Sequence, residues 1–394
     1  MCRAGVAPHL AVARYTHVWP GPGKQEILLR GGRPVNESSA RIGNPGAVAL
    51  VSGGALRHHG DIMQNVARDR QQTTLEDVRA LLGDDWPAVN RLIRESLASD
   101  VLLVNQIGHH ITSGGGKRLR PLTVLLAARA CGYRGAQHVQ AAAVIEFIHT
   151  ATLLHDDVVD DSALRRGRET ANEVWGNQAS VLVGDFLYSR AFQLMVSMGN
   201  LRIMDIMADA TNTIAAGEVL QLMNVHDPDT TEASYREVIY RKTARLFEAG
   251  AHIAAVLAEL PPDAEQSVAA YGRHLGTAFQ LVDDALDYSA EATVSGKNRG
   301  DDLAEGKPTL PLIHAMQRGT DEQRALIRGA IEQGGLVHLD EIRRVIAATG
   351  SLEYTLDLAR AEAARARDAL LVLPEGCFRQ ALEGLAVFAV DRQF

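Results

Sequence analysis

The sequence is poor in cysteine and aromatic residues and contains no long apolar run. Its three cysteines, Cys2, Cys131 and Cys377, are an odd and scattered set among 394 residues. This set favours a reducing compartment over a disulfide framework or a zinc site. The absence of any run of about 18 apolar residues predicts no transmembrane helix, and a net charge of −8 argues against nucleic acid as a partner. We expect a soluble, cytoplasmic, globular protein.

The first 70 residues differ from the rest in charge and composition. Residues 1–70 carry nine Lys and Arg against four Asp and Glu, and they hold ten of the 35 glycines and five of the 13 prolines. That density of Gly and Pro opposes stable helices, and His9, Arg14 and His17 interrupt any secretory signal. We expect a disordered or non-functional basic extension, and Met63 is a candidate translation start.

Beyond residue 70 the pattern becomes helical. Apolar residues recur at spacings of three and four, good helix formers dominate, and no segment alternates with the period of a strand. The sequence predicts one all-α domain over 71–394, built as a large bundle of long antiparallel helices. Helical stretches are expected over residues 87–112, 117–131, 136–158, 176–198, 202–224, 232–258 and 264–289.

Two clusters of aspartates end predicted apolar helices. Both have the pattern D-D-x-x-D, formed by Asp156, Asp157 and Asp160 in the first cluster and by Asp283, Asp284 and Asp287 in the second. In each, the first and last carboxylates lie one turn apart on one helical face, where like charges repel. Mg²⁺ offsets that repulsion and shares its coordination with substrate phosphates. Two such clusters on facing helices predict a site for Mg²⁺ and a diphosphate.

Basic residues accompany both clusters. Gly114–Gly116 precede three cations at a helix start, an arrangement that suits an anion although it does not match a P-loop. These and the later cations are Lys117, Arg118, Arg120, Arg165, Arg166, Lys242, Lys297 and Lys307. We expect two diphosphates, one held through metal and one held directly by Lys, Arg and His.

Several ordered motifs resemble those of a known family. They are G-G-G-K-R-x-R-P, L-L-H-D-D-x-x-D with R-R-G, E-V-L-Q-L, K-T-A-R-L-F, F-Q-L-x-D-D-x-L-D-Y and G-K-P-T-L-P. Over residues 74–393 the chain is similar to the trans-isoprenyl diphosphate synthases, most of all to the long-chain polyprenyl synthases that include bacterial octaprenyl enzymes. The resemblance implies an all-α isoprenoid synthase bundle around a central active-site cavity. It also implies repeated condensation of isopentenyl diphosphate onto an allylic diphosphate such as farnesyl diphosphate.

The resemblance assigns roles to individual residues. The implied metal ligands, for about three Mg²⁺ ions with substrate bound, are Asp156, Asp160, Asp283, Asp284 and Asp287, with Asp157 assisting. The residues implied to hold isopentenyl diphosphate are Lys117, Arg120, His149 and Arg166. Those implied to hold the allylic diphosphate are Arg165, Lys242, Thr243, Gln280, Lys297 and Lys307. Without the resemblance, His149 would be interpreted as a buried helix histidine.

The catalytic chemistry is implied by the same family. Mg²⁺ neutralises the leaving diphosphate as a Lewis acid. The allylic cation that remains needs preorganised dipoles and exclusion of water, which the Thr243 hydroxyl and the Gln280 carbonyl can provide. The released diphosphate is the favoured proton acceptor. The residues predicted to be catalytic are the six aspartates of the two clusters with Lys242, Thr243 and Gln280.

Product length is predicted from the residues one turn before the first cluster. Ala151 and Thr152 are small, whereas short-chain members of the family have bulky aromatics there that close the tunnel for the growing tail. We expect a long product of eight isoprene units or somewhat more, because small side chains leave that path open, and the sequence does not distinguish eight, nine or ten units. The quinone side chain as the product's destination, and a homodimer, rest on the resemblance alone.

Other interpretations stay open on the residues themselves. A single D-D-x-x-D can be a solvated acidic helix end, and His155 beside Asp156 matches a class of metal phosphohydrolases. That class needs further histidines, and His149 lies on another helical face. A terpene cyclase would carry a different second metal motif, and a non-catalytic partner subunit would lack one of the two motifs.

Overall fold

The structure is a computed structural model that describes residues 74–114, 116–165, 167–289 and 300–391. The predicted extension 1–70, together with Met63, lies outside these described residues. Of the two units into which the chain divides, the description below concerns the second, residues 68–394.

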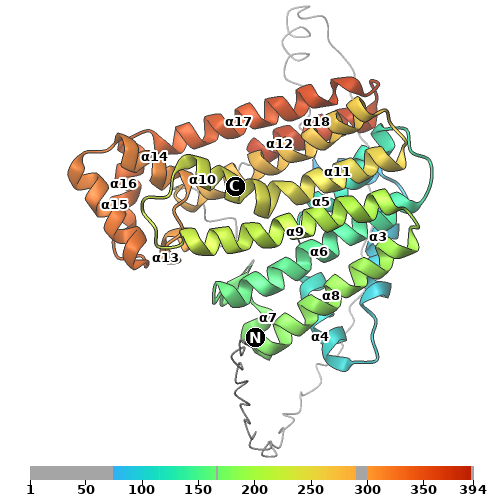
Figure 1. Cartoon of the computed structure of the whole chain (residues 1–394), viewed down its shortest axis with the longest axis horizontal. Helices are drawn as coiled ribbons and strands as arrows, with labels where there is room; N and C mark the ends of the chain where they lie inside the picture. The colour runs from blue at the N-terminus through green and yellow to red at the C-terminus, as the bar shows by residue number, and fades with distance from the viewer. Residues whose placement is uncertain (1–73, 115, 166, 290–299, 392–394) are drawn as a thin grey trace, which may run out of the picture. The chain divides into compact units, whose positions relative to one another are not determined.

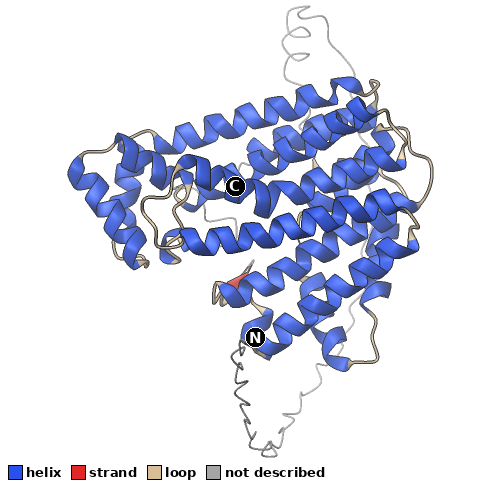
Figure 2. Cartoon of the chain, in the orientation of Figure 1, coloured by secondary structure: helices blue, strands red, loops and turns tan. Residues whose placement is uncertain are grey.

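The described residues are almost entirely helical, which confirms the predicted all-α class (Figures 1 and 2). The α-helices are α2 (Leu75–Leu81), α3 (Asp85–Leu97), α4 (Leu102–Ser113), α5 (Leu119–Ala130), α6 (Gln137–Val159), α7 (Ala171–Trp175), α8 (Asn177–Ser197), α9 (Leu201–Asn224), α10 (Glu232–Ile239), α11 (Arg245–Leu257), α12 (Pro262–Asp287), α13 (Asp301–Ala304), α14 (Leu310–Arg318), α15 (Asp321–Gln333), α16 (Leu339–Ala348), α17 (Ser351–Ala369) and α18 (Cys377–Val390). A π-helix, η1 (Tyr240–Ala244), joins α10 to α11, and a 3-10 turn, η3 (Leu370–Val372), follows α17.

The long helices pack side by side in the order α8, α6, α11, α12 and α17, with α9 against α11 (Figure 1). The core between them is rich in alanine, with Ala141–Ala143 on α6 and Ala254–Ala255 on α11 fully or almost fully buried. Such small side chains let helix backbones approach closely while the apolar surface is removed from water. None of the described helices is both long and apolar enough to cross a membrane.

Two local predictions were wrong. The helix expected over 87–112 is interrupted, because Ala98 and Val101 are extended and the Asn105 side chain bonds the backbone N–H and carbonyl of Ser99 at 3.0 and 2.8 Å. The apolar spacing of three and four continues across this break, so the periodicity of the sequence gave no sign of it.

Strands were not expected either, yet β1 (Leu164–Arg165) and β2 (Arg168–Glu169) form a short antiparallel hairpin. Each strand is too brief to show an alternating pattern.

Helix α12 closely approaches α11, and the π-helix η1 that leads into α11, at two glycines of α12. A Cβ at Gly272 would collide with the carbonyl oxygen of Phe247, and one at Gly276 would lie 2.6 Å from the Cα of Ala244. The absence of side chains at these positions therefore sets the spacing between the two helices. This spacing positions the cavity-facing part of α12 against η1.

We predict that Gly272→Ala destabilises the domain by about 1–3 kcal/mol, because its methyl group would push against the α11 backbone. Gly329→Ala is the matched control, since a Cβ at Gly329 on α15 would meet nothing within 4 Å. That control should gain up to about 1 kcal/mol from helix propensity. Urea unfolding followed by circular dichroism measures both changes, and equal effects of the two variants would contradict the close approach.

Candidate active site

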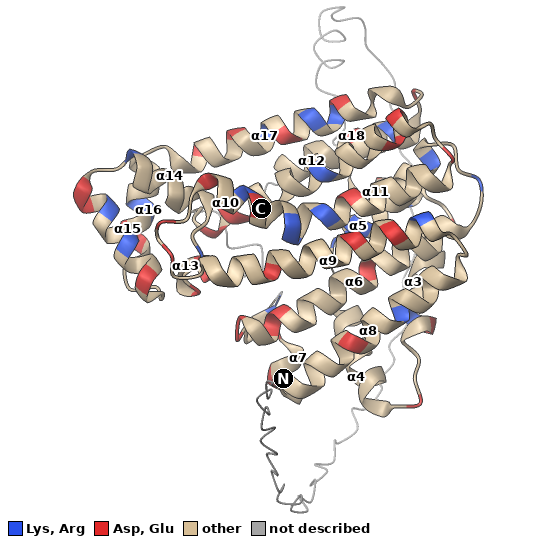
Figure 3. Cartoon of the chain, in the orientation of Figure 1, with Lys and Arg blue, Asp and Glu red and all other residues tan. Residues whose placement is uncertain are grey.

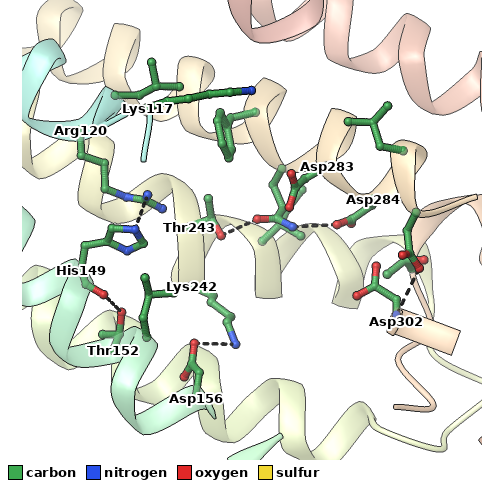
Figure 4. A pocket seen from close by; sticks show the side chains of 18 of the residues that line it. Lys117, Arg120, His149, Thr152, Asp156, Lys242, Thr243, Asp283, Asp284 and Asp302 are labelled. Carbon is green, nitrogen blue, oxygen red and sulfur yellow. Dashed lines mark hydrogen bonds and ion pairs between the residues drawn. The ribbon is translucent and has the colours of Figure 1, made fainter. Parts of the chain in front are cut away.

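A cavity of about 1340 Å³ opens between the helix ends and contains most of the residues singled out in the sequence (Figure 4). Its walls come from the start of α5, the ends of α6, α9 and α12, the π-helix η1, residues 301–309 and one side of α18. Because these segments are distant in sequence, the cavity depends on the packing of the whole bundle.

The first acidic motif closes α6 and is neutralised by two lysines from other elements. α6 ends at Val159, and Asp160 is its C-cap. The Lys242 Nζ lies 3.4 Å from the Asp156 carboxylate, and the Lys307 Nζ lies 2.9 Å from that of Asp160. Burial works to lower the pKa of Lys307, but Asp160 and Glu305 raise it overall. Burial likewise works to lower the pKa of Lys242, but Asp156 and Glu218 raise it overall, so both lysines stay charged and offset the carboxylate repulsion.

Asp157 plays a different part from its two neighbours. Its side chain is buried, does not line the cavity, and accepts a 2.7 Å hydrogen bond from the Arg165 Nε. Burial raises the pKa of Asp157, while Arg165 opposes that rise. Arg165 does line the cavity, so Asp157 and the β1–β2 hairpin hold this guanidinium in place.

The second acidic motif ends α12, and the carboxylates of Asp284 and Asp287 accept hydrogen bonds from other parts of the protein. Asp284 is buried and accepts bonds from the Tyr235 hydroxyl at 2.5 Å and the Gln280 Nε2 at 2.7 Å. Burial, reinforced by Asp302, raises the pKa of Asp284 to about 8. Asp287 accepts bonds from the backbone N–H groups of residues 300–302 at 3.0–3.2 Å. Asp287 thereby fixes the start of α13.

The donor chemistry of the cavity fits a hard divalent cation whose remaining ligands come from a substrate. Carboxylate oxygens from α6 and α12 line one space (Figure 4), and hard cations prefer oxygen donors. Within the described residues, no three His, Cys, Asp or Glu side chains already form a metal cluster. Phosphate oxygens would have to complete the coordination, as is usual for Mg²⁺.

The π-helix η1 directs two neighbouring residues into the cavity. Lys242 donates to Gln221 at 2.7 Å and pairs with Glu218 at 2.6 Å, and Thr243 donates to the Gln280 Oε1 at 2.8 Å. Burial raises the pKa of Glu218 to about 7, against the opposing effect of Lys242. π-Helical turns occur often at functional sites because they realign side chains.

Lys117, Arg120 and His149 lie together in the part of the cavity away from Asp284 and Asp302 (Figure 4). The Arg120 Nη1 is 3.1 Å from the His149 Nε2, and its guanidinium lies over the Phe247 ring at 4.6 Å. The Lys117 ammonium lies over the Phe388 ring at 5.5 Å. The ring faces hold the two cations in place, and all three side chains line the cavity, where they could bind an anion.

His155 points away from this site. Its imidazole Nε2 bonds to the Val181 carbonyl at 3.2 Å and lies 3.4 Å from Asp185, and a Cβ at Gly184 would collide with the ring. His155 is not among the cavity-lining residues. The residue packs α6 onto α8, which gives no support to the metal phosphohydrolase interpretation.

Thr152 and Ala151, predicted to control product length, have different surroundings. Thr152 lines the cavity and donates to the His149 carbonyl at 2.8 Å, whereas Ala151 is fully buried in the core. The predicted residues Arg166 and Lys297 lie outside the described residues. Their roles stay predictions.

Sequence reasoning missed several residues of the cavity. They include Glu146, Tyr235, Asp302 and Glu305, and from α18 Gln380, Glu383, Val387 and Phe388. Glu218 and Gln221 also line the cavity; they belong to the E-V-L-Q-L motif, but no role was predicted for them. The spacing of the α18 residues at three and four matches one helical face, but an ordinary core helix has the same spacing. The acidic pair Asp301-Asp302, close before Lys307, was a signal that could have been used.

Comparison with known proteins gives consistent matches over the helical unit. The family model described as polyprenyl synthetase matches residues 101–348. The octaprenyl diphosphate synthase of Escherichia coli (strain K12) is 59% identical over 319 residues, which cover 81% of this chain and 99% of that enzyme.

Solved structures match as well. The crystal structure of a decaprenyl diphosphate synthase from Rhodobacter capsulatus has a TM-score of 0.77 and 45% identity, and the match covers 81% of this chain and 99% of that one. A polyprenyl synthase from Caulobacter crescentus CB15, complexed with calcium and isoprenyl diphosphate, has a TM-score of 0.79 and 44% identity. That second match covers 82% of this chain and 100% of the other.

Proposed function

The chain belongs to the polyprenyl synthetase family, and on that premise we propose how it acts as a long-chain trans-polyprenyl diphosphate synthase. It is a prenyltransferase that joins isopentenyl diphosphate repeatedly to an allylic diphosphate, with farnesyl diphosphate as the primer and octaprenyl diphosphate as the product. The observation that carries this proposal is the meeting of two acidic motifs and two groups of cations in one cavity.

The two groups of cations suit two different diphosphates. Lys242, Lys307 and Arg165 lie beside the first acidic motif, so they suit the allylic diphosphate that would share its metal with those carboxylates. Lys117, Arg120 and His149 lie together, two of them over aromatic rings, and suit isopentenyl diphosphate held without metal. Arg166 and Lys297 complete the two sets on the family resemblance.

The proposed metal is Mg²⁺, at about three ions with the substrate bound. The residues that would hold it are Asp156, Asp160, Asp283, Asp284 and Asp287. Asp157 would assist indirectly, because its carboxylate holds the guanidinium of Arg165, which lines the same cavity. When bound, Mg²⁺ supplies Lewis acidity that neutralises the leaving diphosphate. The Caulobacter crescentus polyprenyl synthase is complexed with calcium and isoprenyl diphosphate, which supports a divalent cation as a ligand of this chain as well.

A hydrogen-bond chain orients the groups proposed to face the allylic cation. The Tyr235 hydroxyl and the Gln280 amide donate to Asp284, and the Thr243 hydroxyl donates to the Gln280 carbonyl. Because Thr243 gives its proton to Gln280, its oxygen lone pairs can face positive charge. Such preorganised dipoles stabilise a developing charge without reorganising during the reaction.

The direct test incubates the purified full-length chain with Mg²⁺, farnesyl diphosphate and labelled isopentenyl diphosphate, and sizes the products by reversed-phase chromatography. We expect a ladder that ends at octaprenyl diphosphate, with release of inorganic diphosphate. A cyclic hydrocarbon, release of phosphate alone, or no product would each overturn the proposal.

We predict that Asp156→Asn lowers turnover by at least about a hundredfold, because the variant loses one negative ligand for the metal. Asp161→Asn is the matched control: Asp161 follows the same motif but does not line the cavity. Asn also tolerates the left-handed backbone of that residue, with φ of 51°. Turnover measured at saturating Mg²⁺ should therefore change little in the control.

Thr152→Phe is predicted to shorten the product, since a ring at this cavity-lining position would obstruct the growing apolar tail. Thr277→Phe is the size-matched control, because the partly exposed Thr277 on α12 lines neither this cavity nor the smaller pocket beside α6. Thin-layer chromatography of the dephosphorylated products distinguishes the two variants. An identical product ladder in both would reject the proposed path of the tail.

A homodimer is also proposed, with its interface on α8 and α9. Both helices have long uncharged stretches (Figure 3), and Leu182 on α8 and Leu222 on α9 are 66% and 61% exposed. Exposed apolar patches of this kind mark interaction surfaces.

A cytoplasmic location and a quinone side chain as the destination of the product rest on the family resemblance.

We predict that the double variant Leu182→Glu with Leu222→Glu sediments as a monomer where the wild type sediments as a dimer, because it places charges in an apolar interface. Val337→Glu is the control, since Val337 is 92% exposed and lies between α15 and α16. Analytical ultracentrifugation measures the outcome. A monomeric wild type would overturn the dimer without affecting the proposed chemistry.

A further inference from the structure

Lys307 reaches the first acidic motif from a tight turn between α13 and α14. Its ammonium pairs with Asp160 at 2.9 Å and also with Glu305, and its backbone N–H donates to the Asp302 carbonyl at 2.8 Å. Gly306, directly before it, has a φ of 68°, so the turn depends on left-handed backbone. The direction of the Lys307 side chain therefore depends on what holds Gly306.

His226, in the connection between α9 and α10, holds Gly306 from outside the cavity. Its backbone N–H donates to the Gly306 carbonyl at 2.9 Å. Its imidazole covers the Gly306 α-carbon so closely that a Cβ at Gly306 would collide with Nδ1. The two residues thus make one polar and one packing contact with each other.

The imidazole of His226 is itself fixed in orientation. Its Nδ1 lies 2.9 Å from the Ile331 carbonyl of α15, and because a carbonyl can only accept, Nδ1 must carry the proton. A Cβ at Gly334, which directly follows α15, would lie 3.2 Å from Cε1 of the same ring. The ring is thereby held between the α13–α14 turn and the end of α15.

The backbone of His226 is unusual for a residue with a side chain. Its φ is 62°, in the left-handed region where His, Asn and Asp are enriched among non-glycine residues. Such a conformation persists when surrounding contacts determine it, and it is found often at functional positions. Here the contacts that determine it are those to Gly306 and Ile331.

We propose that His226 is a positioning residue for Lys307 and thereby for the allylic diphosphate. The assignment rests on the proposed function, because it assumes that Lys307 binds that diphosphate. His226 does not touch the substrate. It acts by fixing the turn that aims the Lys307 ammonium at the space beside Asp160, where a displacement of about 1 Å is costly.

The test replaces His226 by Gly, which keeps the left-handed backbone but removes the ring. We expect His226→Gly to raise the KM for farnesyl diphosphate about tenfold and to change the KM for isopentenyl diphosphate less than about twofold. His226→Asn, whose side-chain amide can donate as Nδ1 does, should recover most of the affinity. A merely structural role would not separate the two KM values.

A double-mutant cycle shows whether His226 acts through Lys307. In a Lys307→Ala background, His226→Gly should add less than about a twofold change, because the group that it positions is absent. Glu259→Gly is the matched control, since Glu259 also has left-handed backbone, with φ of 55°, but lies in the α11–α12 connection away from the cavity. We expect this control to leave both KM values unchanged.

Each result supports or overturns the assignment. An unchanged farnesyl diphosphate KM in both His226 variants, or an additive effect in the Lys307→Ala background, would overturn the role of His226 alone. Equal rises of both KM values together with a lowered melting temperature would also overturn it, in favour of a general loss of stability. A wild type without prenyltransferase activity would overturn the proposed function, and this assignment with it.

Discussion

Repulsion between carboxylates in one cavity is the constraint on which the rest of the structure depends. Asp156 and its C-cap neighbour Asp160 lie one turn apart at the end of α6, and lysines from η1 and from the α13–α14 turn pair with them. Without these cations, the two like charges would repel each other in a cavity that is partly shielded from water. The segments that follow α9 and α12 must therefore each place a lysine beside the end of α6. Lys242 of η1 and Lys307 of the α13–α14 turn are these lysines.

The bundle meets this constraint through close approach of backbones. Gly272 and Gly276 bring α12 against α11 and η1, and a Cβ at Gly217 on α9 would lie 2.6 Å from the Cβ of Arg241 in η1. With its neighbours this close, the π-helix can direct both Lys242 and Thr243 into the cavity. Gln280 then links Thr243 to Asp284 by hydrogen bonds. The contacts that pack η1 against α12 therefore also position these polar side chains.

Much of the fold and part of the site could be predicted from local patterns. Apolar spacing identified the long helices, and the spacing of the aspartates indicated oxygen ligands on one helical face. The same patterns concealed the break at Ala98–Val101, where apolar spacing continues without helical backbone. They also gave no reason to separate Asp157 from its neighbours, although its burial against Arg165 turns it away from the cavity.

The sequence by itself determined the helical class, the two acidic motifs and the hard-cation chemistry of their ligands, because each depends on residues a few positions apart. Only the tertiary structure decided which charges meet. Asp160 and Lys307 are 147 positions apart, and His226 and Ile331 are 105 apart. No local period encodes such pairs, since they form only when helices distant in the chain pack against one another.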